Sequence, residues 1–161
     1  MPVLRDNQLK TIFQTSLAQL IKQRGLIDWK LFESVLTDTS ELEAKADEQV
    51  AEVEIATKLI EQAINANAHQ SQNQDNYHQR FNQLEVRQRE AIETYETTTA
   101  EIERRTDLKA TLNHYQRTLT TLDNVGNFNP ATFHALCQRI EIAPSGKATV
   151  IWKDGTSTPE Q

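Results

Sequence analysis

The feature that most constrains this sequence is a long stretch, residues 77–122, that contains neither glycine nor proline. Apolar or bulky residues recur along it in steps of three and four, which predicts one continuous helix with a narrow seam. The seam positions are Tyr77, Phe81, Leu84, Gln88, Ala91, Tyr95, Thr98 and Ile102, and then Leu108, Leu112, Tyr115, Leu119 and Leu122. At about 1.5 Å per residue this helix would be roughly 70 Å long. It needs a partner that covers the seam over much of its length.

The preceding segment predicts that partner. Asp28 is a suitable N-cap, and a rhythm of three- and four-residue steps follows it, so we interpret residues 28–69 as one helix. The series is Trp29, Phe32, Leu36, Thr39, Glu43, Ala46, Val50, Val53, Thr57, Ile60 and Ile64. An alternative interpretation breaks this helix at Thr37 to Ser40, because Ser40 followed by Glu43 forms a capping box.

A polar segment, residues 65–76, separates the two helical patterns. It lacks periodicity and is rich in asparagine and glutamine, so it predicts a reversal of the chain. The predicted fold class is therefore mainly α: a long antiparallel coiled-coil hairpin, residues 28–124, on a small α/β base. The tip of the hairpin would lie near residues 65–76, and we expect Ile64, Tyr77 and Phe81 to form a partner-binding surface there.

The two ends of the chain predict the base. Residues 1–27 contain an amphipathic helix with Asp6 as its N-cap. Residues 125–161 begin with Asn129 and Pro130, which favour the start of a short helix that runs to about residue 139. Two strands, near residues 140–143 and 148–153, then predict a β-hairpin. A β-hairpin alone is marginally stable, so it needs the base helices as a packing surface.

The composition predicts helices with narrow buried stripes instead of a large core, and the residues show no recognisable enzyme site. Only 37% of the residues are hydrophobic, and the one cysteine, Cys137, excludes an intramolecular disulfide and a cysteine-based zinc site within this sequence. The four histidines have no metal-binding spacing, and no catalytic pocket or phosphate loop is recognisable, so we predict no catalytic site, no metal and no cofactor. No apolar run is long enough to span a membrane, and we expect a cytoplasmic, reducing environment.

Charge is unevenly distributed along the chain. The net charge is −6, and residues 28–69 are strongly acidic, which argues against DNA lying along this helix. The start of the chain is mildly basic, and Lys10, Lys22 and Arg24 are the candidate DNA-facing residues. A second basic cluster, Arg104, Arg105 and Lys109, lies where two three-residue steps interrupt the seam. We interpret it as a solvated helix surface, with a contact for acidic groups or phosphate as the alternative.

The order of these segments resembles a known family. The second long helix opens with residues 74–84, QDNYHQRFNQL, and the chain closes through residues 128–142, FNPATFHALCQRIEI, and residues 150–156, VIWKDGT. This order resembles the C-terminal part of large serine recombinases, the phage integrases and transposon resolvases, in which a coiled-coil hairpin is inserted in a zinc-ribbon DNA-binding domain. The resemblance covers nearly the whole chain, but the zinc cysteines and the catalytic serine domain of the family have no counterpart here.

The resemblance implies a supporting role in DNA recombination. The partners would be other recombinase subunits through the coiled coil, a directionality factor, and DNA through a parent protein that holds zinc upstream of this segment. No catalytic or metal residue of the family can be assigned to a position of this sequence. Two other interpretations remain open: a free-standing coiled-coil adaptor without a link to DNA, and a small DNA-binding protein that uses its basic first helix and its β-hairpin.

Overall fold

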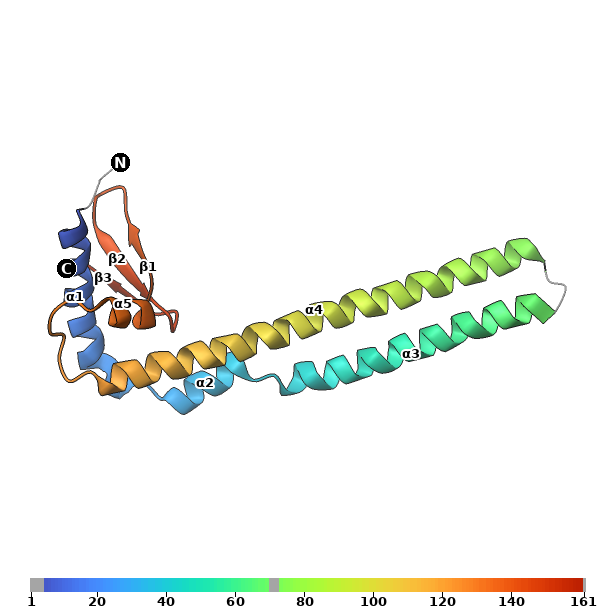
Figure 1. Cartoon of the computed structure of the whole chain (residues 1–161), viewed down its shortest axis with the longest axis horizontal. Coiled ribbons are helices and arrows are strands. Elements are labelled where there is room, and N and C mark those ends of the chain that lie inside the picture. Colours follow the sequence, from blue (N-terminus) through green and yellow to red (C-terminus); the bar gives the residue numbers. More distant parts are fainter. Residues whose placement is uncertain (1–4, 70–72, 161) are drawn as a thin grey trace. The chain divides into compact units, whose positions relative to one another are not determined.

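The computed structural model describes residues 5–69 and 73–160 and is mainly helical, with a small three-stranded antiparallel sheet near the C-terminus (Figure 1). The elements are α1 (Asp6–Gln23), the 3-10 helix η1 (Arg24–Leu26), α2 (Trp29–Thr37), α3 (Ser40–His69), α4 (Gln74–Thr121), α5 (Pro130–Leu136), β1 (Cys137–Ile142), β2 (Ala148–Trp152) and β3 (Ser157–Pro159). The chain divides into two compact units. Unit 1 comprises Met1–Thr37 and Asp107–Gln161, and unit 2 comprises Asp38–Thr106, so α4 contributes to both.

Unit 1 contains the larger apolar core. Helix α1 buries one face at the spacing that the sequence predicted, and the sheet buries alternate residues of β2. Phe13 is at the centre, with its ring 5.0 Å from that of Phe133 and 5.8 Å from that of Trp152. The largest fully buried side chains are Trp152, Tyr115, Phe13, Leu17, Leu119, Leu136 and Val150. The predicted packing of the first helix on the C-terminal segment is therefore confirmed.

The sheet has the order β1–β2–β3, and both pairs are antiparallel. The first two strands form the predicted β-hairpin, and Gly146 in its turn has a φ of 86°, which favours glycine. The third strand was not predicted, because its three residues are too few for a period-two pattern. A turn at Gly155, with a φ of 84°, precedes it, and Trp152 Nε1 donates a buried hydrogen bond of 2.8 Å to Thr158 across this pair.

The prediction of one continuous helix over residues 28–69 is wrong. Helix α2 ends at Thr37 and α3 begins at Ser40, where the alternative interpretation placed the break. The cap differs from the predicted box: the Asp38 carboxylate accepts hydrogen bonds from the backbone N–H of Ser40 at 3.0 Å and from its hydroxyl at 2.7 Å. A short polar side chain that bonds the backbone nearby competes with helix continuation, which explains the break. The predicted Asp28 cap is confirmed by its 3.1 Å bond from Leu31 N–H.

Two other helix ends also differ slightly from the prediction. The N-cap of α1 is Arg5, whose N–H donates to Gln8 Oε1 at 2.8 Å, and Asp6 is the first helical residue. The predicted start of α5 is confirmed, because Asn129 Oδ1 accepts from Ala131 N–H at 2.8 Å. However, α5 ends at Leu136, and Cys137 opens β1 instead of lying on the helix.

Unit 2 consists of α3 and the adjoining part of α4, which lie side by side in Figure 1. Hydrogen bonds join the helices within this unit. Thr57 Oγ1 accepts from Gln88 Nε2 at 2.8 Å, and Asn67 Oδ1 accepts from Gln74 Nε2 at 3.3 Å. The later residue of α3, Asn67, bonds the earlier residue of α4, Gln74, so the two helices run in opposite directions. None of the helices in the described part of the chain is both long and apolar enough to cross a membrane.

Candidate functional site

The α4 seam in unit 2 follows the predicted positions. Every predicted position from Tyr77 to Ile102 is buried or half-buried, and Arg105 continues the series. The α3 seam follows the predicted positions only in part. Ala46, Val53, Thr57 and Ile60 were predicted, whereas Leu42, Gln49, Ala56, Ala63 and Asn67 were not.

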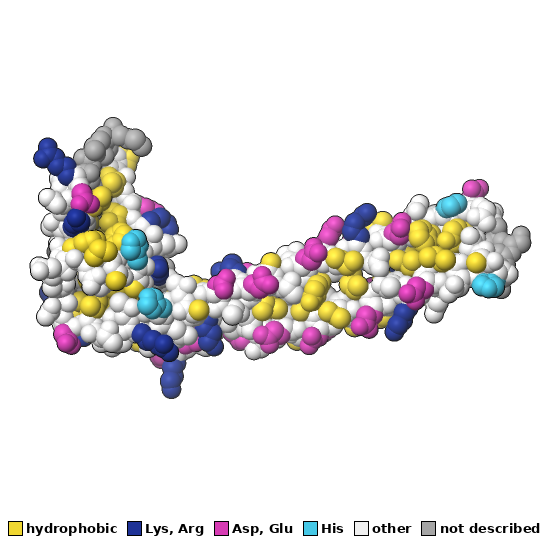
Figure 2. All heavy atoms as spheres, viewed as in Figure 1, with side chains coloured by type: hydrophobic (Ala, Val, Ile, Leu, Met, Phe, Trp, Pro, Cys, Tyr) yellow, Lys and Arg dark blue, Asp and Glu magenta, His cyan; other side chains and the backbone are white. Residues whose placement is uncertain are grey.

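Small residues dominate the most buried positions of these seams. Ala56 is fully buried, and Ala46, Ala63, Ala91 and Thr98 are nearly so. The Oε1 atom of Gln49 is buried without a hydrogen-bond partner among the described residues. Figure 2 shows hydrophobic side chains along the line where α3 and α4 meet. A small-residue seam lets two helices approach closely but buries little apolar area per residue.

The predicted partner-binding residues are only partly brought together. Tyr77 and Phe81 are half-buried neighbours on α4, with ring centroids 5.8 Å apart, and the His78 ring lies 5.5 Å from that of Tyr77. Ile64 lies on α3 with 47% of its surface exposed, outside the buried α3 seam. Residues 70–72 of the predicted tip lie outside the described residues. The aromatic pair is therefore the best-defined apolar feature near this end of unit 2.

An ion pair links α3 and α4 within unit 2. Arg87 Nη2 donates to Glu52 Oε2 at 3.1 Å, and Arg87 Nε donates to the other oxygen of the same carboxylate. This bidentate contact holds the pKa of Glu52 below its usual value and raises that of Arg87. Because both side chains are substantially exposed, the contact contributes more to the register of the helices than to their stability.

The candidate DNA-facing residues have different surroundings in unit 1. Arg24 is half-buried, and its Nη1 donates to the carbonyl oxygens of Leu119, at 2.8 Å, and of Leu122. Lys10 forms an ion pair with Asp6 and lies 5.5 Å from the centroid of the Phe128 ring. Lys22 is exposed. The Arg24 side chain therefore caps the C-terminal end of α4, a role that sequence spacing does not reveal.

The second basic cluster is neutralised by acidic residues of the chain. Arg104 and Arg105 both bond Glu101, at 2.7 and 2.9 Å from their Nε atoms. These hydrogen bonds, first from Arg104 and then from Arg105, lower the pKa of Glu101 to about 2. Arg105 Nη1 also donates to Asp38 O at the break between α2 and α3. This geometry favours a role for Arg104 and Arg105 in holding the helices over a role in binding phosphate.

The basic residue Lys109 lies within unit 1. Its Nζ is 3.3 Å from Glu33 Oε1, so the negative charge of α2 offsets this cation. The cluster that the sequence suggested is thus divided between separate acidic partners.

Residues 5–69 and 73–160 contain no candidate metal centre. No group of three or more histidine, cysteine, aspartate or glutamate side chains in this part could hold a metal ion. Cys137 is buried, and burial raises the pKa of its thiol to about 11, so the thiol is protonated near neutral pH.

Tyr115 and Asp154 form a buried polar pair that the sequence did not indicate. The Tyr115 hydroxyl is fully buried and has no partner at hydrogen-bonding geometry within the described chain. Its burial first, and then the nearby Asp154 charge, raise the pKa of Tyr115. Asp154 is itself buried, and its Oδ1 accepts hydrogen bonds from the N–H and the hydroxyl of Thr156, at 2.9 and 2.6 Å. These bonds explain a structural need for the Asp-Gly-Thr sequence: the aspartate holds the turn before β3.

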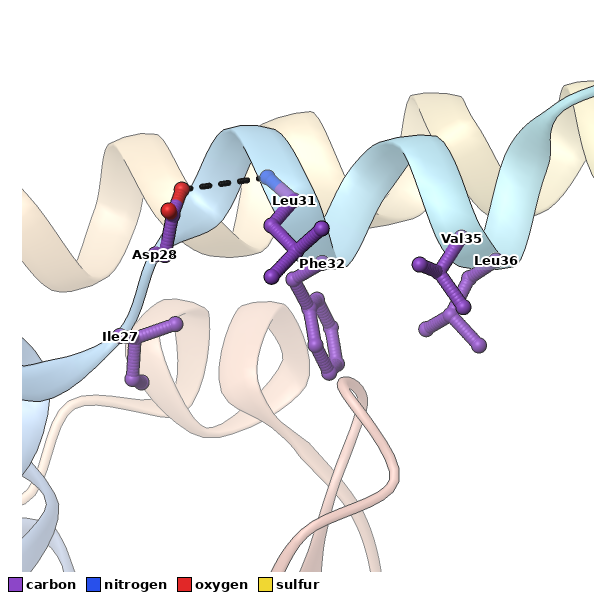
Figure 3. A pocket seen from close by; sticks show the side chains of 6 residues that line it. All are labelled: Ile27, Asp28, Leu31, Phe32, Val35 and Leu36. Carbon is purple, nitrogen blue, oxygen red and sulfur yellow. Dashed lines mark hydrogen bonds between the residues drawn. The ribbon is translucent and has the colours of Figure 1, made fainter.

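Sequence analysis also missed an exposed apolar face on α2. Leu31 and Val35 are 61% and 69% exposed, although both are large and hydrophobic. Together with Ile27, Phe32 and Leu36 they line a shallow groove of about 420 Å³ whose only polar lining residue is Asp28 (Figure 3). The signal was present in the sequence, because Leu31 and Val35 are four residues apart, but the predicted seam included only Phe32 and Leu36 of the residues that line the groove.

Comparisons with known protein families, with curated proteins and with solved structures found no match to this chain.

Proposed function

We propose that this chain is a non-catalytic interaction module of a site-specific DNA recombinase, in which α3 and α4 form a coiled-coil hairpin that binds other recombinase subunits. One observation carries the interaction part of this proposal: α3 and α4 run in opposite directions along unit 2 and are joined by side-chain hydrogen bonds. Contacts at Glu52, Thr57 and Asn67 of α3 support a single register over several helical turns.

A paired helix unit of this kind suits protein–protein contact better than chemistry or nucleic-acid binding. Its basic side chains at Arg87, Arg104 and Arg105 are each bonded to an acidic residue of the same unit. Three of the seven lysine and arginine side chains of unit 2 are thus held by carboxylates, and binding to DNA along α3 and α4 would bring the more numerous acidic residues toward the phosphates.

The assignment to a recombinase rests on the resemblance of the sequence. The order of helix, helical pair, short helix and antiparallel strands agrees with that resemblance, and the Asp154 turn supplies a physical reason for its last motif. In this proposal DNA is bound by the parent protein, zinc is held upstream of this segment, and a directionality factor is a further partner. The test is the coding sequence upstream of the chain. A serine catalytic domain and a four-cysteine cluster there support the assignment, and an unrelated neighbour favours the free-standing adaptor instead.

We propose Tyr77 and Phe81 as the subunit-binding residues, with Ile64 as an adjacent apolar contact. Self-association of the chain would be measured by analytical ultracentrifugation for the wild type and for a Tyr77→Ser/Phe81→Ser variant. The matched control is Val86→Ser/Ile92→Ser, which removes two exposed apolar side chains of α4 that lie farther along the helix.

The expected result is weaker association for the aromatic variant and unchanged association for the control. Equal association in all three proteins would refute the tip assignment while leaving the helix pairing intact. Equal weakening in both variants would indicate a contact spread along α4 instead of one at Tyr77 and Phe81.

A further inference from the structure

Strand β1 is one edge of the sheet, and its outer side has no partner strand among the described elements (Figure 1). Gln138, Arg139, Glu141 and Ile142 are all exposed along this edge. An edge strand with unpaired backbone groups is a template for another strand. The edge is in unit 1 and is separate from the residues of the proposed tip.

The hydrogen-bond pattern identifies the residues of β1 that face outward. Ala143 N–H donates to Lys147 O at 2.8 Å, which makes this a hydrogen-bonded pair of the β1–β2 ladder. Because such pairs recur at every second residue, Glu141 and Arg139 bond to β2, opposite Thr149 and Ile151. Ile140 and Ile142 therefore direct their N–H and C=O groups away from β2, toward the open edge.

The side chains beside these groups form a self-complementary charge pattern. Arg139 and Glu141 lie on the same face of β1, on either side of Ile140, and they bond each other at 2.7 Å. In an antiparallel pair of two β1 strands centred on Ile140, Arg139 of each copy faces Glu141 of the other. These positions are non-hydrogen-bonded pairs, in which the side chains approach most closely.

We propose that β1 is a self-pairing edge through which two copies of this chain join their sheets, antiparallel and centred on Ile140. The outward backbone groups and the charge pattern independently select this register. If the pairing were shifted by one residue, the N–H and C=O groups of Arg139 and Glu141, which point toward β2, would stand opposite the outward groups of the second copy. If it were shifted by two residues, Arg139 would no longer face Glu141 of the other copy.

Two features make this contact weak and therefore reversible. The register of β1 against β2 is irregular between Cys137 and Arg139, and a bulge of this kind limits the regular part of the edge to a few residues. The net charge of −6 also opposes the approach of two copies. The pairing would thus add to another interaction that brings copies together, instead of forming a permanent dimer.

The first test uses charge reversal in the full chain, in a Tyr77→Ser/Phe81→Ser background so that tip contacts do not contribute. Arg139→Glu and Glu141→Arg are each expected to weaken self-association about tenfold in ultracentrifugation, because each converts two attractive cross-strand pairs into repulsive ones. The combined Arg139→Glu/Glu141→Arg variant restores association. The controls Lys58→Glu and Glu54→Arg make the same changes in net charge at exposed positions of α3, away from the edge.

The second test monitors amide hydrogen exchange in the same background. Exchange at Ile140 and Ile142 should slow as the protein concentration rises from about 10 µM to about 1 mM, because mass action favours the dimer. The amides of Arg139 and Glu141, already bonded to β2, serve as internal references. Concentration-independent exchange at Ile140 and Ile142, or failure of the combined charge variant to restore association, would overturn the proposal.

Discussion

Replacement of Arg24 tests whether this residue is a helix cap or a DNA contact. Its guanidinium donates to the carbonyls of Leu119, in the last turn of α4, and of Leu122, the residue that follows α4, where backbone carbonyls lack partners within the helix. A hydrogen bond to a charged group contributes about 1.5–3 kcal/mol. Since Arg24 is half-buried and its two bonds share one nitrogen, we expect Arg24→Met to lower the free energy of unfolding of unit 1 by about 2 kcal/mol.

The assay is urea unfolding followed by tryptophan fluorescence. Both tryptophans, Trp29 and Trp152, lie in unit 1, so their emission reports this unit alone. With an m-value of about 2 kcal/mol/M, the midpoint should fall by roughly 1 M. Arg24→Lys should lose about half as much, because an ammonium group is a point donor without the geometry of the guanidinium. A change below about 0.5 kcal/mol for Arg24→Met would refute the capping role.

The matched control is Lys22→Met, which removes an exposed positive charge from the last turn of α1, two residues before Arg24. We expect its midpoint to remain close to that of the wild type, because surface substitutions usually change stability by less than about 0.5 kcal/mol. Equal losses in the Arg24 and Lys22 variants would point to a general effect of charge near the end of α1 instead of a specific cap.

Three further predictions follow from burial and charge. Cys137, whose thiol pKa is raised by burial to about 11, should resist a thiol reagent at pH 8 until urea unfolds unit 1. For the same reason the neutral thiol contributes to the free energy of unfolding of unit 1 below the unfolded pKa near 9, and this contribution is lost as pH rises through 11. The pKa of Glu101 is lowered from 4.5 to about 2, so its ionised form stabilises unit 2 above pH 4.5 and this stabilisation is lost as pH falls toward 2. The helix signal in circular dichroism should therefore decrease over this range in the wild type, and decrease less in Glu101→Gln. Ala56→Leu should destabilise the helix pair by about 1–3 kcal/mol in thermal unfolding, whereas Ala51→Leu on the exposed face of α3 should change it little.

Most elements of unit 1 could be predicted because their signals are local. The apolar face of α1, the Asn129 cap and the turn at Gly146 each follow from a few adjacent residues. Strand β3 could not be predicted in this way. It exists because Asp154 holds the turn and Thr158 meets Trp152 across the sheet, and these are contacts between residues that only folding brings together.

The spacing of the buried positions along α3 could be predicted, but which residues occupy them could be predicted only in part. Val50 and Ile64 were expected in the seam because they are large and apolar, yet they are 41% and 47% exposed. The seam position beside Val50 is Gln49 and that beside Ile64 is Ala63, and a hydrophobicity pattern ranks both below valine and isoleucine. Close approach of two helices favours the smallest side chain at the contact, so a seam of alanines can prevail over a neighbouring row of larger residues.

The slip in the α4 seam, which the sequence predicted, and the break between α2 and α3, which only the alternative interpretation contained, belong together. The slip in the α4 seam lies at Arg105, and the break between α2 and α3 exposes the carbonyl of Asp38. The Arg105 guanidinium donates to that carbonyl, and the same side chain is held by Glu101 one turn earlier. A seam position that carries arginine instead of leucine thus compensates for a backbone group that the break leaves without a helical partner. The basic residues at this point of the sequence therefore have a structural explanation that requires no external anion.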